Sequence, residues 1–140
     1  MMNIIEISNS FCINYLSCIR RAATKLNITQ AQALCINAIP FEGISQSDLA
    51  RKLSVDISTL SRNLDKLIFL DAIYKTSSNL DKRSYKISLT NQGKALYQQF
   101  NNHIKEEVES IYHSLELSES DQLQEILNKL NWQLELINKQ

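Results

Sequence analysis

The stretch from residue 56 to residue 67 combines short polar and cationic side chains with a regular apolar pattern. Its apolar residues Ile57, Leu60, Leu64 and Leu67 recur at steps of three and four, which predicts a helix with one buried stripe. From Ser58 onwards the opposite face carries hydroxyl, amide and cationic groups, with no carboxylate before Asp65. These groups are Ser58, Thr59, Ser61, Arg62, Asn63 and Lys66. Such side chains reach base edges and phosphates, whereas an ordinary solvated helix more often pairs Glu with Lys. The pattern therefore favours a nucleic-acid contact.

A second short helix is predicted immediately before this one. Ser45, with Asp48 three residues later, is a start signal for it, and Asp56 is then the N-cap of the next helix. The spacing of the two helices is that of a helix-turn-helix. Ser45 and Gln46, at the start of the first helix, join the residues that we expect to contact DNA.

The segment after these helices reads as a β-hairpin. Residues 72–76 and 84–89 alternate apolar and polar side chains, as strands with one buried face do. The polar tip between them carries Lys82 and Arg83, and Arg83 is the residue best placed to enter a minor groove. Asp81 is close enough in sequence to hold the Arg83 guanidinium in position. Two short helices followed by such a hairpin predict a winged helix, with one helix in the major groove and the loop beside it.

Long amphipathic helices are predicted on both sides of this segment. One covers residues 4–26, and two more follow from Thr90 and from Ser118, which we expect to act as N-caps. Their apolar stripes exceed what a small winged-helix core can cover, which predicts a second copy of the chain as partner. The residues predicted at this homodimer interface are Ile7, Phe11, Leu123, Leu127, Leu130 and Leu134.

The expected fold is mainly α, of the α+β class: a winged helix-turn-helix DNA-binding domain with a helical dimerisation region from the N- and C-terminal helices. The chain of 140 residues suits one domain. We expect the winged-helix lobe to span about residues 29–90. The dimerisation lobe is expected to combine residues 1–28 and 91–140.

The charge distribution agrees with this division, although the formal net charge is zero. Residues 51–86 contain eight Lys or Arg against four Asp or Glu, whereas residues 105–140 contain three against eight. A chain so polarised can present a basic face to phosphates. No apolar run approaches the roughly 20 residues of a membrane span, and the first residues do not resemble a secretion signal. We therefore expect a cytoplasmic protein that does not bind membranes.

Catalysis is not expected from this sequence. It contains no glycine-rich phosphate loop, and Cys12, Cys18 and Cys35 do not have the spacing of a metal site. His103 and His113 lie ten residues apart on one predicted helix, so they do not meet at one site. We predict no catalytic residue, no metal and no cofactor. The alternative function is a winged helix that makes only protein contacts and does not bind DNA. The cations at Arg62, Lys66, Lys82 and Arg83 disfavour this alternative.

These features together resemble the MarR family of bacterial regulators over nearly the whole chain. The resemblance is carried by DKRSYKISLT from Asp81 to Thr90, then Gly93, and by the helix-turn-helix segments SQSDLA and TLSRNLDKL. It implies a homodimer that binds double-stranded DNA at a palindromic operator, as a repressor released by a small aromatic or other ligand. One departure is Asp71, which stands where the family usually has glycine after the recognition helix.

Cys12 supports a different kind of regulation. It lies in the segment FCINY, which looks like the position where peroxide-sensing members of the family place a reactive cysteine near tyrosines. A sensor needs a stabilised thiolate, and the hydroxyl of Tyr15 is one candidate donor. The alternatives are therefore a thiol-based regulator of the same fold, or a Cys12 that is only a small apolar side chain.

Overall fold

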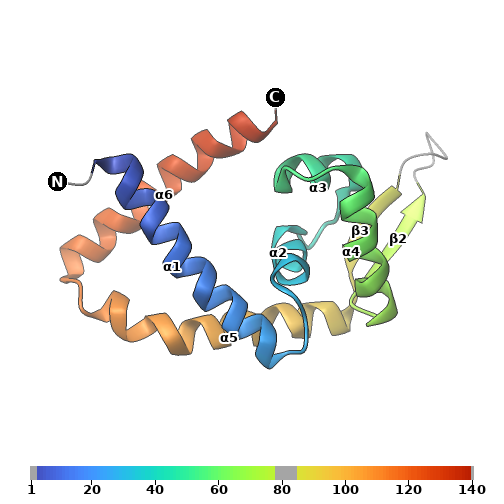
Figure 1. The fold of residues 1–140 in the computed structure, drawn as a ribbon, viewed down its shortest axis with the longest axis horizontal. Helices are drawn as coiled ribbons and strands as arrows, with labels where there is room; N and C mark the ends of the chain where they lie inside the picture. Colours follow the sequence, from blue (N-terminus) through green and yellow to red (C-terminus); the bar gives the residue numbers. More distant parts are fainter. Residues whose placement is uncertain (1–2, 78–84, 140) are drawn as a thin grey trace.

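The structure is a computed structural model that describes residues 3–77 and 85–139. It is mainly helical, with one small sheet (Figure 1). The elements in chain order are α1 (Ile4–Lys25), α2 (Gln30–Ala38), β1 (Ile44–Ser45), α3 (Gln46–Leu53), α4 (Ile57–Phe69), β2 (Ile73–Ser77), β3 (Tyr85–Leu89), α5 (Asn91–His113) and α6 (Leu117–Asn138). The predicted fold class, a winged helix with flanking long helices, is confirmed.

Side-chain caps set the starts of the helices, because a capping oxygen satisfies backbone N–H groups that have no partner within the helix. Thr29 accepts a hydrogen bond from the Gln32 N–H, and the Gln32 side chain accepts one from the Thr29 N–H. Ser45 and Thr90 cap α3 and α5 with single hydrogen bonds, their hydroxyls accepting from the N–H groups of Asp48 and Gly93. The starts at Ser45 and Thr90 agree with the sequence-based predictions.

The predicted cap of the last helix is wrong. α6 begins at Leu117, and the backbone N–H of Glu116 donates to the Glu119 carboxylate at 3.0 Å. The Glu119 side chain reaches back one turn and satisfies the backbone N–H at the start of α6. The helix therefore needs no hydroxyl residue as its cap. Ser118 and Asp121 consequently lie inside the first turns of α6.

The sheet has the strand order β1–β3–β2, and both pairings are antiparallel. In its register Ile73 faces Leu89 and Ile44 faces Ile87. Ile87 belongs to the central strand and is fully buried. The hairpin is thereby joined to the loop before α3, which fixes it against the helix-turn-helix.

The core of this part is formed by the inner faces of α2, α3 and α4. Ile36, Leu49, Leu60, Leu64 and Leu67 are all buried completely or nearly so. Three of the four residues predicted for the α4 stripe are therefore confirmed. The prediction for Ile57 is wrong, because its side chain is 50% exposed. As the first residue of α4, Ile57 lies one turn before Leu60, the first α4 residue in the core.

The long helices form the other part of the molecule. α1 crosses α5, and the alanines Ala22 and Ala23 are buried in the same core as Phe100 and Ile104 of α5 (Figure 1). Small side chains in α1 permit a close approach of the two helices. α6 turns back from the end of α5, and its C-terminal end lies near α3 (Figure 1). No residue described in α6 is buried within the single chain.

The turn between α4 and the hairpin depends on a left-handed residue, Asp71, and on a close approach at Gly93. Asp71 has a φ of 57°, which lies in the left-handed region that favours glycine. The Thr90 hydroxyl donates to the Asp71 carbonyl, and the Thr90 N–H donates to the Ala72 carbonyl. At Gly93 a Cβ would lie 1.9 Å from the Ala72 oxygen, so only glycine allows α5 to start this close to β2.

Candidate nucleic-acid interface

The N-terminus of α4 is fixed by Asp56. One carboxylate oxygen accepts from the Thr59 N–H at 2.7 Å and from the Ser58 hydroxyl at 2.7 Å. The Thr59 N–H, followed by the Ser58 and Thr59 side chains, lowers the pKa of Asp56 to about 2. The carboxylate is therefore ionised at neutral pH, at the positive end of the helix dipole. This anion caps the helix and holds the Ser58 hydroxyl in place.

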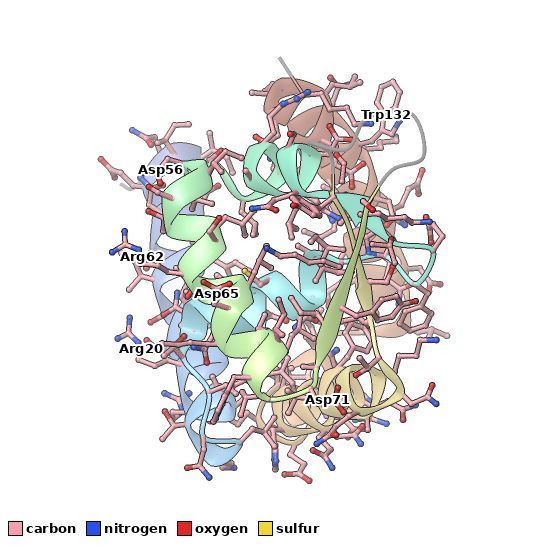
Figure 2. All side chains as sticks on the ribbon, turned by 90° about the vertical axis from the view of Figure 1, so that its right-hand side faces the viewer. Arg20, Asp56, Arg62, Asp65, Asp71 and Trp132 are labelled. Atoms are coloured by element: carbon pink, nitrogen blue, oxygen red, sulfur yellow. The ribbon has the colours of Figure 1, made fainter. Side chains whose placement is uncertain are left out.

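The outer face of α4 presents a row of polar groups at steps of one helical turn. Ser58, Arg62 and Lys66 are exposed, four residues apart along the helix. Thr59, Ser61 and Asn63 are half-buried beside them. The Arg62 side chain extends away from α4 at the edge of the molecule (Figure 2). This row has the chemistry for base-edge and phosphate contacts.

Two of the residues predicted to contact DNA, Gln46 and Ser61, form a hydrogen bond with one another. The Gln46 amide donates to the Ser61 hydroxyl at 3.0 Å, which links the first turn of α3 to the middle of α4. Ser45 uses its hydroxyl to accept the Asp48 N–H. No local pattern predicts the positioning role of Gln46, because its partner lies 15 residues further along the chain.

The tip of the hairpin, with Asp81, Lys82 and Arg83, lies outside the described residues. The strands that lead to it are basic. The Lys75 ammonium lies 5.6 Å from the centre of the Tyr85 ring, in a cation–π contact between paired strands. Lys86 is exposed on β3 and pairs with Thr76 of β2. Both cations lie on the strands adjoining the predicted tip.

The predicted interface residues of the long helices are exposed in the single chain. Ile7, Phe11, Leu130 and Leu134 are each at least 50% exposed, and Leu127 is 39% exposed. Leu123 is half-buried. Other apolar side chains at the start of α1 are exposed as well, among them Ile4 and Ile5. These helices thus present a large apolar area that the single chain leaves uncovered.

The three cysteines have different surroundings. Cys12 is exposed, Cys18 is half-buried and Cys35 is buried, and burial raises the pKa of the Cys35 thiol to about 11. The nearby Tyr15 ring stacks on Phe11. Burial, and then the neighbouring Tyr112 and Cys18, raise the pKa of Tyr15. Sensing by Cys12 stays a prediction.

The two histidines lie at different places on α5. His103 Nδ1 is 3.6 Å from Glu106, and His113 Nε2 is 4.0 Å from Glu109. Among residues 3–77 and 85–139, no three His, Cys, Asp or Glu side chains lie close enough to hold a metal ion. Within the same residues, no helix is long and apolar enough to cross a membrane.

Known proteins share this arrangement of a helix-turn-helix, a small sheet and long flanking helices. The sequence model of the MarR family matches residues 26–85, from the end of α1 to the start of β3. The resemblance to the MarR family is confirmed. The matched segment includes α3, α4 and β2, and thus the whole helix-turn-helix. It ends at the first residue of β3. No curated protein matches the sequence.

Solved MarR structures share the fold along nearly the whole chain. Apo MarR from E. coli is 23% identical, with 93% of this chain and 97% of that chain covered and a TM-score of 0.80. The S. aureus MepR–DNA complex is 21% identical, with 95% and 99% covered and a TM-score of 0.73. A MarR protein from Peptoclostridium difficile is 21% identical, with 98% and 90% covered and a TM-score of 0.77. At these identities the likeness establishes the fold.

Proposed function

We propose that the chain is a MarR-type transcription regulator that binds double-stranded DNA at a palindromic operator as a homodimer. The observation that carries the proposal is the outer face of α4. This helix exposes Ser58, Arg62 and Lys66 at steps of four residues, within the segment that matches the MarR model. The solved MepR of the same fold is bound to DNA, which supports the same use of the fold here.

Dimerisation is supported by the apolar faces of α1 and α6. A palindrome offers two half-sites about 34 Å apart, which a two-fold symmetric dimer reads with two copies of α4. A second copy of the chain is the simplest partner, because its matching faces can cover Ile7, Phe11 and Leu130 in a symmetric interface. Association and folding are then coupled.

Repression released by a small ligand completes the proposal. A concavity of about 610 Å³ lies between two parts of the chain. One side is α3 with the loop that precedes it, and the other side is the C-terminal end of α6. Asp48, Arg51 and Lys52 line it on one side, and Glu135 and Lys139 on the other. A ligand with both polar and charged groups fits this lining, and its binding there would change how the two parts are held together.

The proposal is tested by selecting binding sites from a random pool of duplex DNA with the parent protein. We expect a palindromic site to be enriched. Arg62→Ala should weaken binding to that site by about 1–3 kcal/mol and reduce discrimination at one base pair of each half-site. Lys66→Ala should weaken binding to all sequences alike and lower the salt dependence. Fluorescence anisotropy at several salt concentrations measures both effects.

Two outcomes contradict the proposal. If no sequence is enriched and the parent binds duplex DNA no better than a helical control protein, the winged helix serves protein contacts instead. If DNA is bound but Arg62→Ala and Lys66→Ala leave the affinity unchanged, the α4 face is not the recognition surface.

A further inference from the structure

The C-terminal half of α1 carries a basic surface outside the helix-turn-helix. From Ile7 to Leu26 the sequence has three cations, Arg20, Arg21 and Lys25, and no Asp or Glu. A shallow concavity of about 480 Å³ lies along this helix. Its lining consists only of cations and hydroxyl residues: Ser17, Arg20, Arg21, Thr24 and Lys25. Arginine, lysine and hydroxyl side chains are the groups that contact DNA phosphates.

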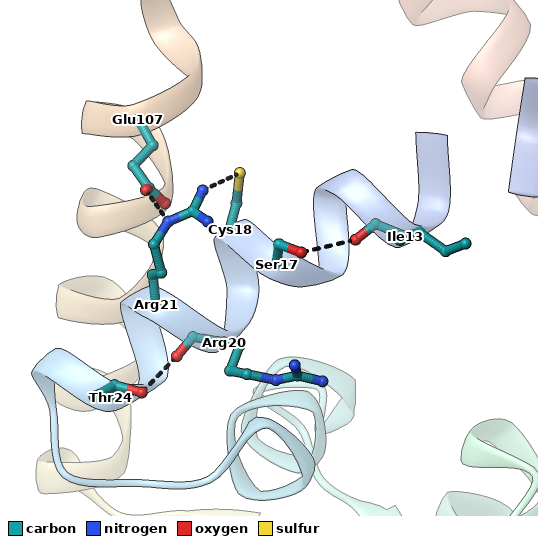
Figure 3. A network of polar contacts seen from close by, with 7 residues as sticks. All are labelled: Ile13, Ser17, Cys18, Arg20, Arg21, Thr24 and Glu107. Carbon is teal, nitrogen blue, oxygen red and sulfur yellow. Dashed lines mark hydrogen bonds and ion pairs between the residues drawn. The ribbon is translucent and has the colours of Figure 1, made fainter. Parts of the chain in front are cut away.

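The two adjacent arginines have different environments (Figure 3). Arg21 turns towards α5, where its Nε lies 2.6 Å from the Glu107 carboxylate and a terminal nitrogen donates to Cys18 Sγ. The charge of Arg21 is thus balanced within the fold. Arg20 points to the other side of α1 (Figure 3) and is exposed. Among the ion pairs of the described residues, none includes Arg20.

Arg20 is also held in a defined position. Its Nε and one terminal nitrogen both donate to the side-chain oxygen of Gln30, at 3.3 and 3.1 Å. Gln30 is the first residue of α2, so this clamp joins the end of α1 to the helix-turn-helix part. Because the partner is a neutral amide, the positive charge is not cancelled. The other N–H groups of the guanidinium remain available to an anion.

Arg20 and the recognition helix face the same way. In Figure 2 the side chains of Arg20 and Arg62 both extend from the same edge of the molecule, whereas Asp65 lies on another side of α4. α2 packs against both α1 and α4 and keeps their spacing. In Figure 1 the C-terminal half of α1 lies between α4 and the N-terminal half of α1, whose apolar residues are exposed. A duplex that enters α4 would therefore pass Arg20 on the side of the operator centre.

We propose that Arg20, with Lys25 beside it, forms a second DNA contact that binds backbone phosphates between the two half-sites. The Ser17 and Thr24 hydroxyls donate to carbonyls of α1 itself, so the two cations carry the contact. The inference rests on the proposed DNA-binding function, and it adds a site outside the recognition helix and hairpin. Arg20 contributes affinity without sequence preference, because phosphates carry no base information. Gln30 is a positioning residue for this contact.

The test compares Arg20→Ala with the parent on the duplex selected by the parent, across a range of salt concentrations. Loss of one phosphate contact in each subunit should lower the affinity on the order of tenfold. The slope of log affinity against log salt should fall by about 2, one for each contact. Discrimination between selected and unrelated duplexes should stay that of the parent. Arg20→Lys should retain most of the slope, and thermal unfolding confirms that each variant is folded.

Lys129→Ala is the matched control, because it removes one positive charge from α6, where Lys129 lies 3.7 Å from Glu125. It should bind as the parent does. The parent protein should bind the selected duplex more weakly when the linkages at its centre are uncharged methylphosphonates. The affinity of Arg20→Ala should not change with that replacement. If Arg20→Ala behaves like Lys129→Ala while Arg62→Ala is weakened, the α1 contact is wrong and the proposed function stands. If the parent selects no duplex, the proposed function itself is wrong.

Discussion

At the scale of single residues, Asp56 connects the helix cap with the proposed DNA-contacting face of α4. Its carboxylate holds the Thr59 N–H and the Ser58 hydroxyl, and these contacts lower its pKa to about 2. In the unfolded chain an aspartate titrates near pH 4. A lowered folded-state pKa means that the ionised cap stabilises the protein above about pH 4. That contribution is lost as the pH falls through about 2.

The corresponding prediction concerns the free energy of unfolding at acid pH. Asp56→Asn retains a capping oxygen but has no carboxyl to titrate, so it should lose less stability than the parent between pH 4 and pH 2. Urea unfolding at a series of pH values measures the difference. Asp121→Asn, on the exposed side of α6, is the control and should follow the parent. Parallel profiles for the parent and Asp56→Asn would show that the cap does not titrate as described.

At the scale of elements, the start of α5 is packed against the turn before β2. Gly93 allows this approach, since a Cβ would lie 1.9 Å from the Ala72 oxygen. The Thr90 hydrogen bonds to Asp71 and Ala72 hold the same junction. Because backbone atoms form the obstacle, neither side can yield by rotating a side chain. The position of the hairpin relative to α5 therefore depends on this glycine.

Gly93→Ala should lower the free energy of unfolding by about 3 kcal/mol, through displacement of α5 from the turn. Gln92→Ala changes the neighbouring exposed residue of the same helical turn and should lie within about 0.5 kcal/mol of the parent. Urea denaturation followed by circular dichroism measures both variants. A Gly93→Ala protein as stable as Gln92→Ala would contradict the close approach.

At the scale of the whole molecule, the uncovered apolar face of α6 is the main unbalanced feature. Leu130 and Leu134 are 53% and 54% exposed, and no described residue of α6 is buried. The apolar stripe of a helix in a folded protein packs against another apolar surface. The proposed homodimer supplies that surface, and it also sets the spacing of the two recognition helices.

Leu130→Asp should abolish or strongly weaken this dimer, because it places a carboxylate in an apolar interface. Sedimentation velocity at micromolar concentration distinguishes the dimeric parent from a monomeric or unfolded variant. Asn128→Asp introduces the same charge on the polar side of α6 and should sediment as the parent does. A parent that sediments as a folded monomer would contradict the dimer.

Local patterns in the sequence determined most of the elements. Caps such as Thr29 with Gln32 act within one turn, so their residue types predict the helix starts directly. The stripe of Leu60, Leu64 and Leu67 and the alternation of the hairpin strands likewise follow from the period of each element. The failures, at Ile57 and Ser118, lie at helix ends, where several nearby residues can serve as the boundary.

Which side chains meet across long separations depends on the packing of the helices. The link from Gln46 to Ser61, the clamp of Gln30 on Arg20 and the pair of Arg21 with Glu107 each join different helices. Arginines adjacent in the sequence thus have different partners: Arg21 pairs with a carboxylate, and Arg20 with a neutral amide. Helix periodicity predicts the face on which a residue lies. What that face meets depends on how the helices pack, and packing is set by contacts that no local pattern records.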